Sequence, residues 1–383
     1  MSLAATDLPE ASADALAASA ALERIIAAEI SAGGGWMSFA RYMELALYAP
    51  GLGYYSGGSR KFGSEGDFLT APELTPLYGQ ALAQQVAQVL AASAPLVIEA
   101  GAGSGRLAAD LLQALDALGC APEHYRILEL SGELRARQAA TLRETAPRFA
   151  DRVQWLDELP ERFSGCLVGN EVLDAMPTHG LRWDDKDVWE NGVGLEDGRL
   201  VPAERPATGA LLAAAKPMSL IAPHRGEINL AARAWVSELA RRLERGAMLL
   251  IDYGLPRHEL YHPQRDGGTL RCHYRHRVHD DSLWLPGLSD ITSHVDFTAV
   301  AEAGFDAGLE VLGYTSQATF LINCCIGELL GQDSNVDELR SRGAANVLIS
   351  PNEMGELFKV IALGRGVPGP LLGFARGDRV HTL

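Results

Sequence analysis

A glycine-rich turn and three acidic residues are the first features of this sequence that could do chemistry. The turn spans residues 101–105, with Glu99 two residues before its first glycine. Glu129 and Asp157 follow two later apolar runs. Glycine lets the backbone approach a ligand closely, and carboxylates accept hydrogen bonds from amino and hydroxyl groups. Together these residue types predict a site for a nucleoside-containing cofactor.

The spacing of the glycines separates three classes of cofactor. Gly101, Gly103 and Gly105 alternate with small residues, and Arg106 follows them. A dinucleotide fingerprint would need a glycine in place of Arg106, and a P-loop would end in a lysine and a hydroxyl residue. S-adenosylmethionine carries no phosphate, so its turn only has to bring the backbone close to the methionine and ribose parts. The pattern favours S-adenosylmethionine, with an NAD-dependent oxidoreductase as the enzyme alternative.

Each acid has a role in this interpretation. Glu99 orders the turn and accepts contacts from the ammonium group of the cofactor, and Glu129 accepts both ribose hydroxyls. Asp157 receives the adenine amino group, while Leu156 packs against the ring. Glu129 also comes later than the roughly 20 residues expected after a dinucleotide turn, which argues against NAD. A carboxylate at a strand end is often only a solvated cap, so the joint placement of the acids carries the prediction.

Alternating strands and helices must bring these residues to one edge of a sheet. Helical patterns include 106–118 and 228–244, the second with Gly246 as its C-terminal cap. The alternation predicts an α/β fold with a seven-stranded, mostly parallel sheet and helices on both faces. Ligands of such folds lie beyond the carboxyl ends of the strands. The runs predicted as strands are 96–100, 125–130, 152–156, 166–170, 247–254, 309–314 and 357–364.

The pattern divides the chain into two parts. Residues 1–92 form an N-terminal helical region with a lid loop, and residues 93–383 form the core. Two segments interrupt the alternation of the core, at about 182–226 and 255–296. The first contains Asn-Gly and Asp-Gly pairs, which are typical of β-hairpins. Both segments are candidate substrate-binding elements, because insertions beyond the strand ends border the ligand site of this fold class.

The lid loop offers two interpretations of one motif. In "GDFLTAPE", Asp67, Thr70 and Glu73 could fold over the cofactor. Thr70 could instead cap the helix that begins near Pro72, because its spacing to Glu73 is that of a capping box.

Bulk properties exclude several function classes. The chain has 383 residues, 47% of them hydrophobic, and a net charge of -16, so non-specific binding to nucleic acid is not expected. No apolar run approaches the ~20 residues that span a bilayer, and the N-terminus lacks signal-peptide features. Five cysteines without a CxxC pattern favour a reducing cytoplasm. The His- and Cys-containing run 271–281 lacks zinc-ligand spacing, and no metal is predicted.

Seven stretches of the chain resemble the MidA-like family, bacterial relatives of the mitochondrial protein arginine methyltransferase that acts in assembly of respiratory complex I. The resemblance implies a class I methyltransferase (Rossmann-like) fold, S-adenosylmethionine as donor and a protein substrate, which in the mitochondrial member is a complex I subunit. Without a transit-like N-terminus, a bacterial cytoplasmic member is expected, and a homodimer is compatible with the sequence. The stretches are "GDFLTAPEL" (66–74), "EAGAGSGRLAADLL" (99–112), "GNEVLDAMP" (169–177), "LLIDYG" (249–254), "GGTLRCHYRHR" (267–277), "DITSHVDF" (290–297) and "GELFKVIALGRG" (355–366).

An arginine acceptor, which the resemblance implies, sets a chemical requirement. Its guanidinium stays protonated at neutral pH, and carboxylates can bind its N–H groups bidentately and aim the attacking nitrogen. The motif "NEVLDAMP" offers Asn170, Glu171 and Asp174 just beyond a predicted strand. Glu171 is the first choice for the acceptor-facing acid and Asp174 the second. Alternatively, Asn170 is the N-cap of a helix with Glu171 in its first turn.

Two further hypotheses stay open. His294 is a candidate proton acceptor, although with Arg271 and Asp296 it could simply hold the second insertion in place by hydrogen bonds. The non-enzyme alternative to a methyltransferase is an assembly chaperone that binds S-adenosylmethionine and holds a respiratory-complex subunit without turning over. The intact cofactor motifs argue against that alternative.

Overall fold

The computed structural model describes residues 8–57, 70–218, 220–330 and 336–383. It contains two compact units, each built from separate stretches of chain. Unit 1 comprises Met1–Phe68, Leu173–Arg233 and Arg257–Asp296, and unit 2 comprises Leu69–Val172, Ala234–Pro256 and Phe297–Leu383. Both predicted insertions thus group with the N-terminal helical region, whereas the helix before the glycine turn groups with the core.

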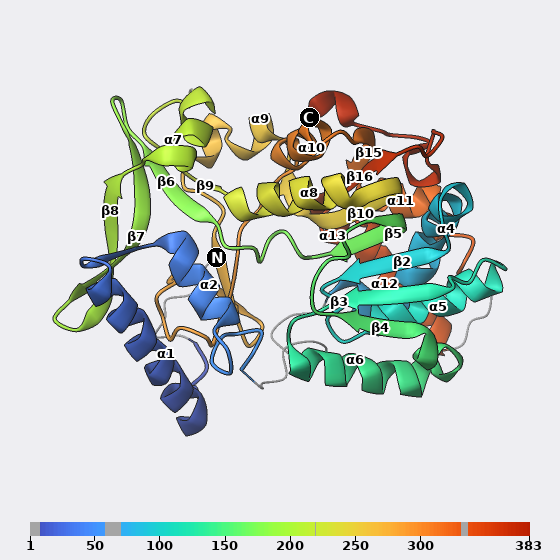
Figure 1. Ribbon diagram of the computed structural model, residues 1–383, viewed down its shortest axis with the longest axis horizontal. Coiled ribbons are helices and arrows are strands. Elements are labelled where there is room, and N and C mark those ends of the chain that lie inside the picture. The colour runs from blue at the N-terminus through green and yellow to red at the C-terminus, as the bar shows by residue number, and fades with distance from the viewer. Residues whose placement is uncertain (1–7, 58–69, 219, 331–335) are drawn as a thin grey trace. The chain divides into compact units, whose positions relative to one another are not determined.

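Unit 2 holds a sheet with the strand order β15-β16-β10-β5-β2-β3-β4 (Figure 1). Neighbours from β10 to β4 pair in parallel, whereas β16 pairs antiparallel with both β10 and β15. The mostly parallel sheet is therefore confirmed. Its strands are β2 (Leu96–Ala100), β3 (His124–Leu128), β4 (Val153–Leu156), β5 (Phe163–Asn170), β10 (Leu243–Leu255), β15 (Glu310–Ser316) and β16 (Phe358–Arg365).

The register aligns the carboxyl ends of the central strands. Ala100 of β2 lies opposite Leu128 of β3 and Gly169 of β5. The residues that follow these three positions therefore lie at one edge of the sheet. They are the glycine turn, Glu129 and Asn170, the last residue of β5, as the sequence predicts.

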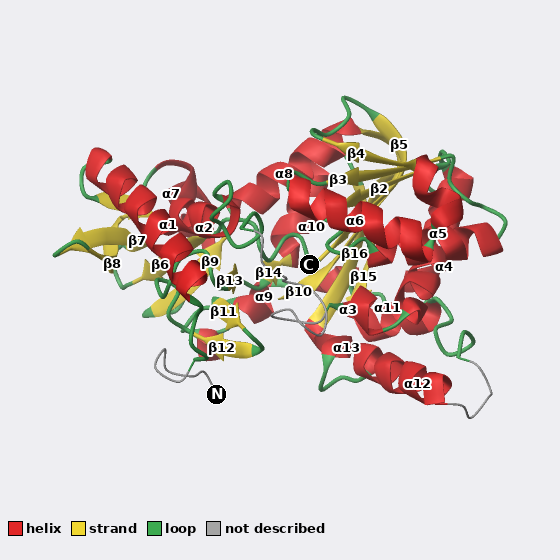
Figure 2. Ribbon diagram, turned by 90° about the horizontal axis from the view of Figure 1, so that it is seen from below, coloured by secondary structure: helices red, strands yellow, loops and turns green. Residues whose placement is uncertain are grey.

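Helices cover both faces of the sheet in unit 2. α4 (Pro76–Ala92) and α5 (Arg106–Ala117) pack on one face in a continuous apolar cluster with Val97, Ile127 and Val168, and Figure 2 shows both beside the strands. α10 (Phe297–Asp306) packs on the opposite face, where a Cβ on Gly304 would lie 2.7 Å from Leu363. The other helices of this unit are α3 (Ala71–Leu74), α6 (Gly132–Thr145), α11 (Gln317–Asn323), α12 (Val336–Ile349) and α13 (Met354–Leu357), and α8 (Leu230–Arg242) begins in unit 1.

Unit 1 contains a five-stranded and a three-stranded sheet. In the first, β1, β7, β6 and β9 follow one another and β8 also pairs with β7; the second has the order β12-β11-β13. The strands of these two sheets are β1 (Trp36–Ser38), β6 (His179–Trp183), β7 (Val188–Glu196), β8 (Arg199–Pro206), β9 (His224–Ile228), β11 (Arg271–Tyr274), β12 (Arg277–His279) and β13 (Asp290–Thr292); the short β14 (Val295–Asp296) belongs to neither sheet. The helices are α1 (Ala13–Ala32), α2 (Phe39–Tyr48), α7 (Gly209–Ala215) and α9 (Arg257–Leu260).

Each of the seven apolar runs predicted as strands forms a strand, but two glycines were misinterpreted. Gly246 does not cap a helix: α8 ends at Arg242 and β10 begins at the next residue. Gly192 lies inside β7 rather than in a turn, and glycine is needed there because a Cβ would come within 2.4 Å of the Trp36 ring. The predicted Asp-Gly hairpin is confirmed at Asp197 and Gly198, between β7 and β8, where both residues have positive φ. The short β14 was not predicted, and the sheet that contains β10 has eight strands rather than the predicted seven.

Candidate active site

The glycine turn has the backbone conformation that its composition predicts. Gly101, Gly103 and Gly105 have φ angles of 64°, 53° and 85°, in the left-handed region that favours glycine. Gly105 is the N-cap residue of α5, and a Cβ there would lie 2.9 Å from Cα of Gln138. The turn is therefore free of side chains on the side where it meets α6. It leads directly into a helix whose first N–H groups have no partner within the helix.

Glu129 belongs to a network that reaches the glycine turn. Its Oε1 accepts the backbone N–H of Ser131 at 2.9 Å, and its Oε2 accepts Nε2 of Gln138 at 3.2 Å. Gln138 Nε2 also lies 3.2 Å from the carbonyl oxygen of Gly103, and its Oε1 accepts the indole N–H of Trp155. Burial raises the pKa of Glu129, although the hydrogen bonds from Ser131 and Gln138 lower it. Sequence reasoning missed Gln138, whose only signal is a polar residue on the buried face of α6.

Glu99 lies inside the sheet rather than on the surface of the turn. Its side chain is 2% exposed, and its Oε2 accepts the hydroxyl hydrogen of Tyr125 at 2.5 Å. Burial raises the pKa of Glu99 to about 7, although the hydrogen bond from Tyr125 lowers it. Its contact with the cofactor ammonium group stays a prediction.

The predicted adenine-binding residues are held by Arg135 on α6. Its guanidinium donates to the carbonyl oxygens of Glu129 and Leu156, and it forms a 2.8 Å ion pair with Asp157. This arrangement ties together the ends of β3 and β4. Leu130, the residue after Glu129, is an apolar side chain that is 79% exposed. Contacts of Leu156 and Asp157 with an adenine ring stay predictions.

The acceptor motif begins with strained backbone. Glu171 follows β5 with a φ of 54°, a conformation that is uncommon for a residue with a side chain. Its N–H donates to the carbonyl oxygen of Ile251 at 2.8 Å, and the N–H of Val172 donates to Oδ2 of the buried Asp252 at 3.1 Å. Strain of this kind is retained where the surrounding structure enforces it, often at functional sites. Asn170 is followed by a turn and not by a helix, so the alternative of Asn170 as a helix N-cap is wrong.

The side chain of Asn170 connects Glu171 to a tyrosine that sequence reasoning missed. The hydroxyl of Tyr78, on α4, donates to Oδ1 of Asn170 at 2.5 Å. Nδ2 of Asn170 donates to Oε1 of Glu171 at 2.9 Å. Burial raises the pKa of Tyr78 well above its ordinary value, and the nearby carboxylates of Glu171 and Asp252 raise it further. The phenol therefore stays protonated and acts as a donor.

The described part of the lid motif also reaches the glycine turn. The hydroxyl of Ser104 donates to Oε1 of Glu73. Thr70 occupies the N-cap position of α3, but its side chain makes no capping hydrogen bond, so the capping-box alternative is not formed. Asp67 lies outside the described residues. A role for Thr70 over the cofactor stays a prediction.

The remaining predicted site residues belong to unit 1. The backbone carbonyl of the buried Asp174 accepts the N–H of Ser293 at 3.1 Å. The next residue, His294, donates its own backbone N–H to Oγ1 of Thr269 at 3.0 Å. Asp296 accepts Nε of Arg257 at 3.2 Å, which agrees with its predicted part in holding the insertion. The chemical roles of Asp174 and His294 stay predictions.

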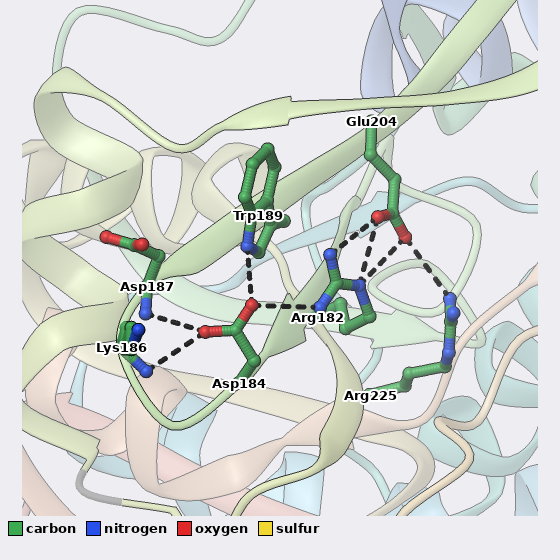
Figure 3. Close-up of polar contacts among 7 residues, drawn as sticks. All are labelled: Arg182, Asp184, Lys186, Asp187, Trp189, Glu204 and Arg225. Carbon is green, nitrogen blue, oxygen red and sulfur yellow. Dashed lines mark hydrogen bonds and ion pairs between the residues drawn. The ribbon is translucent and has the colours of Figure 1, made fainter.

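The first insertion carries a charge-balanced network on its hairpins (Figure 3). Arg182 binds Glu204 through two of its nitrogens and also pairs with Asp184. Asp184 accepts the indole N–H of Trp189 at 2.8 Å, while Trp183 is buried in a small apolar cluster of unit 1. Both tryptophans therefore pack the insertion.

The structure offers no metal centre or membrane anchor in the part of the chain that it describes. Among these residues, no three or more His, Cys, Asp or Glu side chains gather in a way that could hold a metal ion. Likewise, none of the described helices combines the length and the apolar character needed to cross a membrane.

The fold and the site together define a class of protein. The antiparallel β16 lies between β10 and β15, a glycine turn follows β2, and an acid follows β3. This is the arrangement of class I methyltransferases. The chain belongs to the MidA-like family of S-adenosylmethionine-dependent methyltransferases, since a family described as an S-adenosyl-L-methionine-dependent methyltransferase matches residues 80–315.

Relatives agree with this assignment. A solved COG1565 superfamily member from Burkholderia thailandensis, bound to S-adenosyl-homocysteine, is 53% identical with a TM-score of 0.95. The match covers 98% of this chain and 100% of that one. The mitochondrial protein arginine methyltransferase NDUFAF7 of Danio rerio is 28% identical over 86% of this chain and 83% of its own length. Its Drosophila melanogaster homolog is 29% identical over 96% and 91%. S-adenosylmethionine is therefore the cofactor.

Proposed function

We propose that this methyltransferase transfers a methyl group to an arginine side chain of a protein. The observation that carries the proposal is the position of Glu171, whose strained backbone directly follows β5 at the edge where the glycine turn also leaves the sheet, and whose carboxylate accepts a hydrogen bond from Asn170. The curated relatives named protein arginine methyltransferases support the same acceptor. We further propose Asp174 as the second acceptor-facing acid.

The residues around the turn fit the cofactor. The left-handed glycines carry no side chains, so a ligand can approach the protein backbone of the turn closely. Near the turn, Glu129 offers a carboxylate that can accept hydrogen bonds from ribose hydroxyl groups. When bound, S-adenosylmethionine supplies a methyl group activated by a positive sulfur. The chain itself has to hold the acceptor in line and exclude other orientations.

Glu171 meets the specific demand of an arginine acceptor. A guanidinium stays protonated at neutral pH, so its attacking nitrogen has little free electron density until the charge is drawn to the other nitrogens. A carboxylate hydrogen-bonded to those nitrogens draws the charge and fixes the direction of attack. Methylation of the guanidinium releases one proton, and we propose that the carboxylate of Glu171 accepts it.

The test uses the purified chain, methyl-labelled S-adenosylmethionine and a bacterial protein extract freed of small molecules. After acid hydrolysis, we expect the label in methylated arginine. Label in lysine, histidine or carboxyl groups would overturn the arginine acceptor. Cofactor binding without any transferred label would favour the chaperone alternative. Glu171→Gln should abolish transfer and leave cofactor affinity within about twofold of the unchanged chain, because it keeps the shape but removes the charge.

A further inference from the structure

We propose that Tyr78 is a positioning residue for methyl transfer, acting through Asn170 to aim the carboxylate of Glu171. The proposal rests on the role given to Glu171 under Proposed function. Three hydrogen-bonding groups stand in series: the Tyr78 hydroxyl, the Asn170 amide and the Glu171 carboxylate. All three belong to unit 2. No sequence motif points to Tyr78, which precedes Asn170 by almost a quarter of the chain.

The chemistry of the amide gives the series a direction. A carboxamide has one oxygen that only accepts and one nitrogen that only donates. Because the Tyr78 hydroxyl donates to Oδ1, the nitrogen of Asn170 must face Glu171, where it donates to Oε1 at 2.9 Å. Without the hydroxyl, the amide could turn over and present its oxygen to the carboxylate. Two acceptors would then face each other, and Glu171 would move away.

The position of Tyr78, the first group of the series, is fixed by its helix. Tyr78 is 2% exposed and lies in the first turn of α4. Thr75 caps this helix by accepting the N–H of Leu77, and Pro76 occupies its first position. Both features hold the beginning of a helix in one conformation. The Tyr78 hydroxyl therefore has a defined position from which to orient the amide.

The position of the Glu171 carboxylate, the last group of the series, is fixed only in part by the backbone. The strained φ of Glu171 is enforced by its N–H bond to Ile251 and by the bond from Val172 to Asp252. These bonds determine where the side chain starts. They do not determine where the flexible carboxylate ends, because a glutamate has three side-chain torsions. The amide of Asn170 supplies a hydrogen bond at that end.

The experiment compares Tyr78→Phe with Tyr42→Phe in the full chain. Tyr42 is also a buried tyrosine, and its hydroxyl donates to the carbonyl oxygen of Ser282 at 2.6 Å, within unit 1. For Tyr78→Phe we expect kcat for labelled methyl transfer to fall about 10- to 100-fold, the range for one charge-linked hydrogen bond. The Kd for S-adenosyl-homocysteine, measured by calorimetry, should stay within twofold. Tyr42→Phe should retain kcat.

A double-mutant cycle tests whether Tyr78 acts through the amide. In an Asn170→Ala background, Tyr78→Phe should cause little further loss of kcat, because the connecting group is already gone. Additive losses would overturn the connection. Unchanged kcat in Tyr78→Phe would overturn the proposal, and so would a fall that comes with equal loss of cofactor binding or folding.

The failure of this proposal can be told apart from failure of the proposed function. If Glu171→Gln turns over normally, the role of Glu171 is wrong, and Tyr78 has nothing to position. If Glu171→Gln is inactive while Tyr78→Phe is normal, only the positioning role is wrong. If label reaches an amino acid other than arginine, the acceptor is wrong, but the comparison between Tyr78→Phe and Tyr42→Phe still applies to that transfer.

Discussion

The hydroxyl of Tyr125, on β3, donates a 2.5 Å hydrogen bond to Oε2 of Glu99, on the neighbouring β2. This pair lies two residues before the glycine turn, in the interior of unit 2. Burial raises the pKa of Glu99 from its ordinary 4.5 to about 7, even though the bond from Tyr125 opposes the shift. The carboxyl group therefore keeps its proton to a higher pH than an exposed glutamate does.

This raised pKa predicts a pH-dependent stability. Between pH 4.5 and about 7, the folded state keeps a proton on Glu99 that the unfolded state has lost. Folding stability therefore falls as pH rises through this window, and levels off above it. The full shift corresponds to roughly 3 kcal/mol, as an upper bound. We expect Glu99→Gln to be the more stable protein at pH 8, with the difference shrinking toward pH 5 in urea unfolding curves. A difference that is constant with pH would contradict the raised pKa.

Glu129 should contribute to cofactor affinity through its charge. Hydrogen bonds to charged groups are worth about 1.5–3 kcal/mol, so Glu129→Gln should weaken S-adenosyl-homocysteine binding roughly 10- to 100-fold. Calorimetry measures this directly. The control is Glu133→Gln on α6, where the glutamate forms an exposed ion pair with Arg137 and the change should leave Kd unchanged. If the two variants changed Kd equally, Glu129 would not be a cofactor-binding residue.

Gly105 should tolerate no side chain. Its φ of 85° costs any other residue about 1–2 kcal/mol, and a Cβ would lie 2.9 Å from Cα of Gln138. We expect Gly105→Ala to lower the free energy of unfolding by roughly 2 kcal/mol or more and to weaken cofactor binding. Gly132→Ala is the matched control, because a Cβ there meets nothing within 4 Å and the change should be neutral or stabilising by up to ~1 kcal/mol. Thermal unfolding without S-adenosyl-homocysteine measures the change in stability of each variant, and the added stabilisation with S-adenosyl-homocysteine measures its cofactor binding.

Glu171 should show a conflict between stability and activity. Alanine removes its carboxylate but keeps the penalty of a φ of 54°, whereas glycine removes both. We expect Glu171→Gly to be as stable as Glu171→Ala or more stable, by up to about 1 kcal/mol. Both should be inactive in methyl transfer. A Glu171→Ala protein that is clearly the more stable of the two would show that the strain is not stored at this residue.

The sequence predicts those parts of the fold and site that depend on neighbours along the chain. The run ending at Ala100 predicts β2, because a strand buried on both faces is mostly apolar, and Glu99 is its one charged residue. The glycines predict left-handed backbone, because few other residues adopt it. The position of Glu129 follows from the parallel pairing of β2 and β3, which puts both strand ends at one edge.

Contacts between distant segments were beyond the reach of these arguments. Tyr78 and Gln138 lie on helices whose sequence patterns look ordinary, and only tertiary packing brings their side chains to Asn170 and Glu129. Gly192 follows an asparagine in a typical turn pair, yet it lies in a strand, where the Trp36 ring leaves no room for a side chain. In each case the deciding group comes from a distant part of the chain.

The antiparallel β16 also has a consequence for biosynthesis. It stands between β10 and β15, and its residues 358–365 are made long after those of β10. Until they leave the ribosome, the strand that joins these two is missing from the nascent chain. Pairings between residues this far apart in sequence form slowly. We therefore expect unit 2 to complete its folding only after β16 has been translated. Until then, we expect a chaperone to bind the exposed edges of β10 and β15.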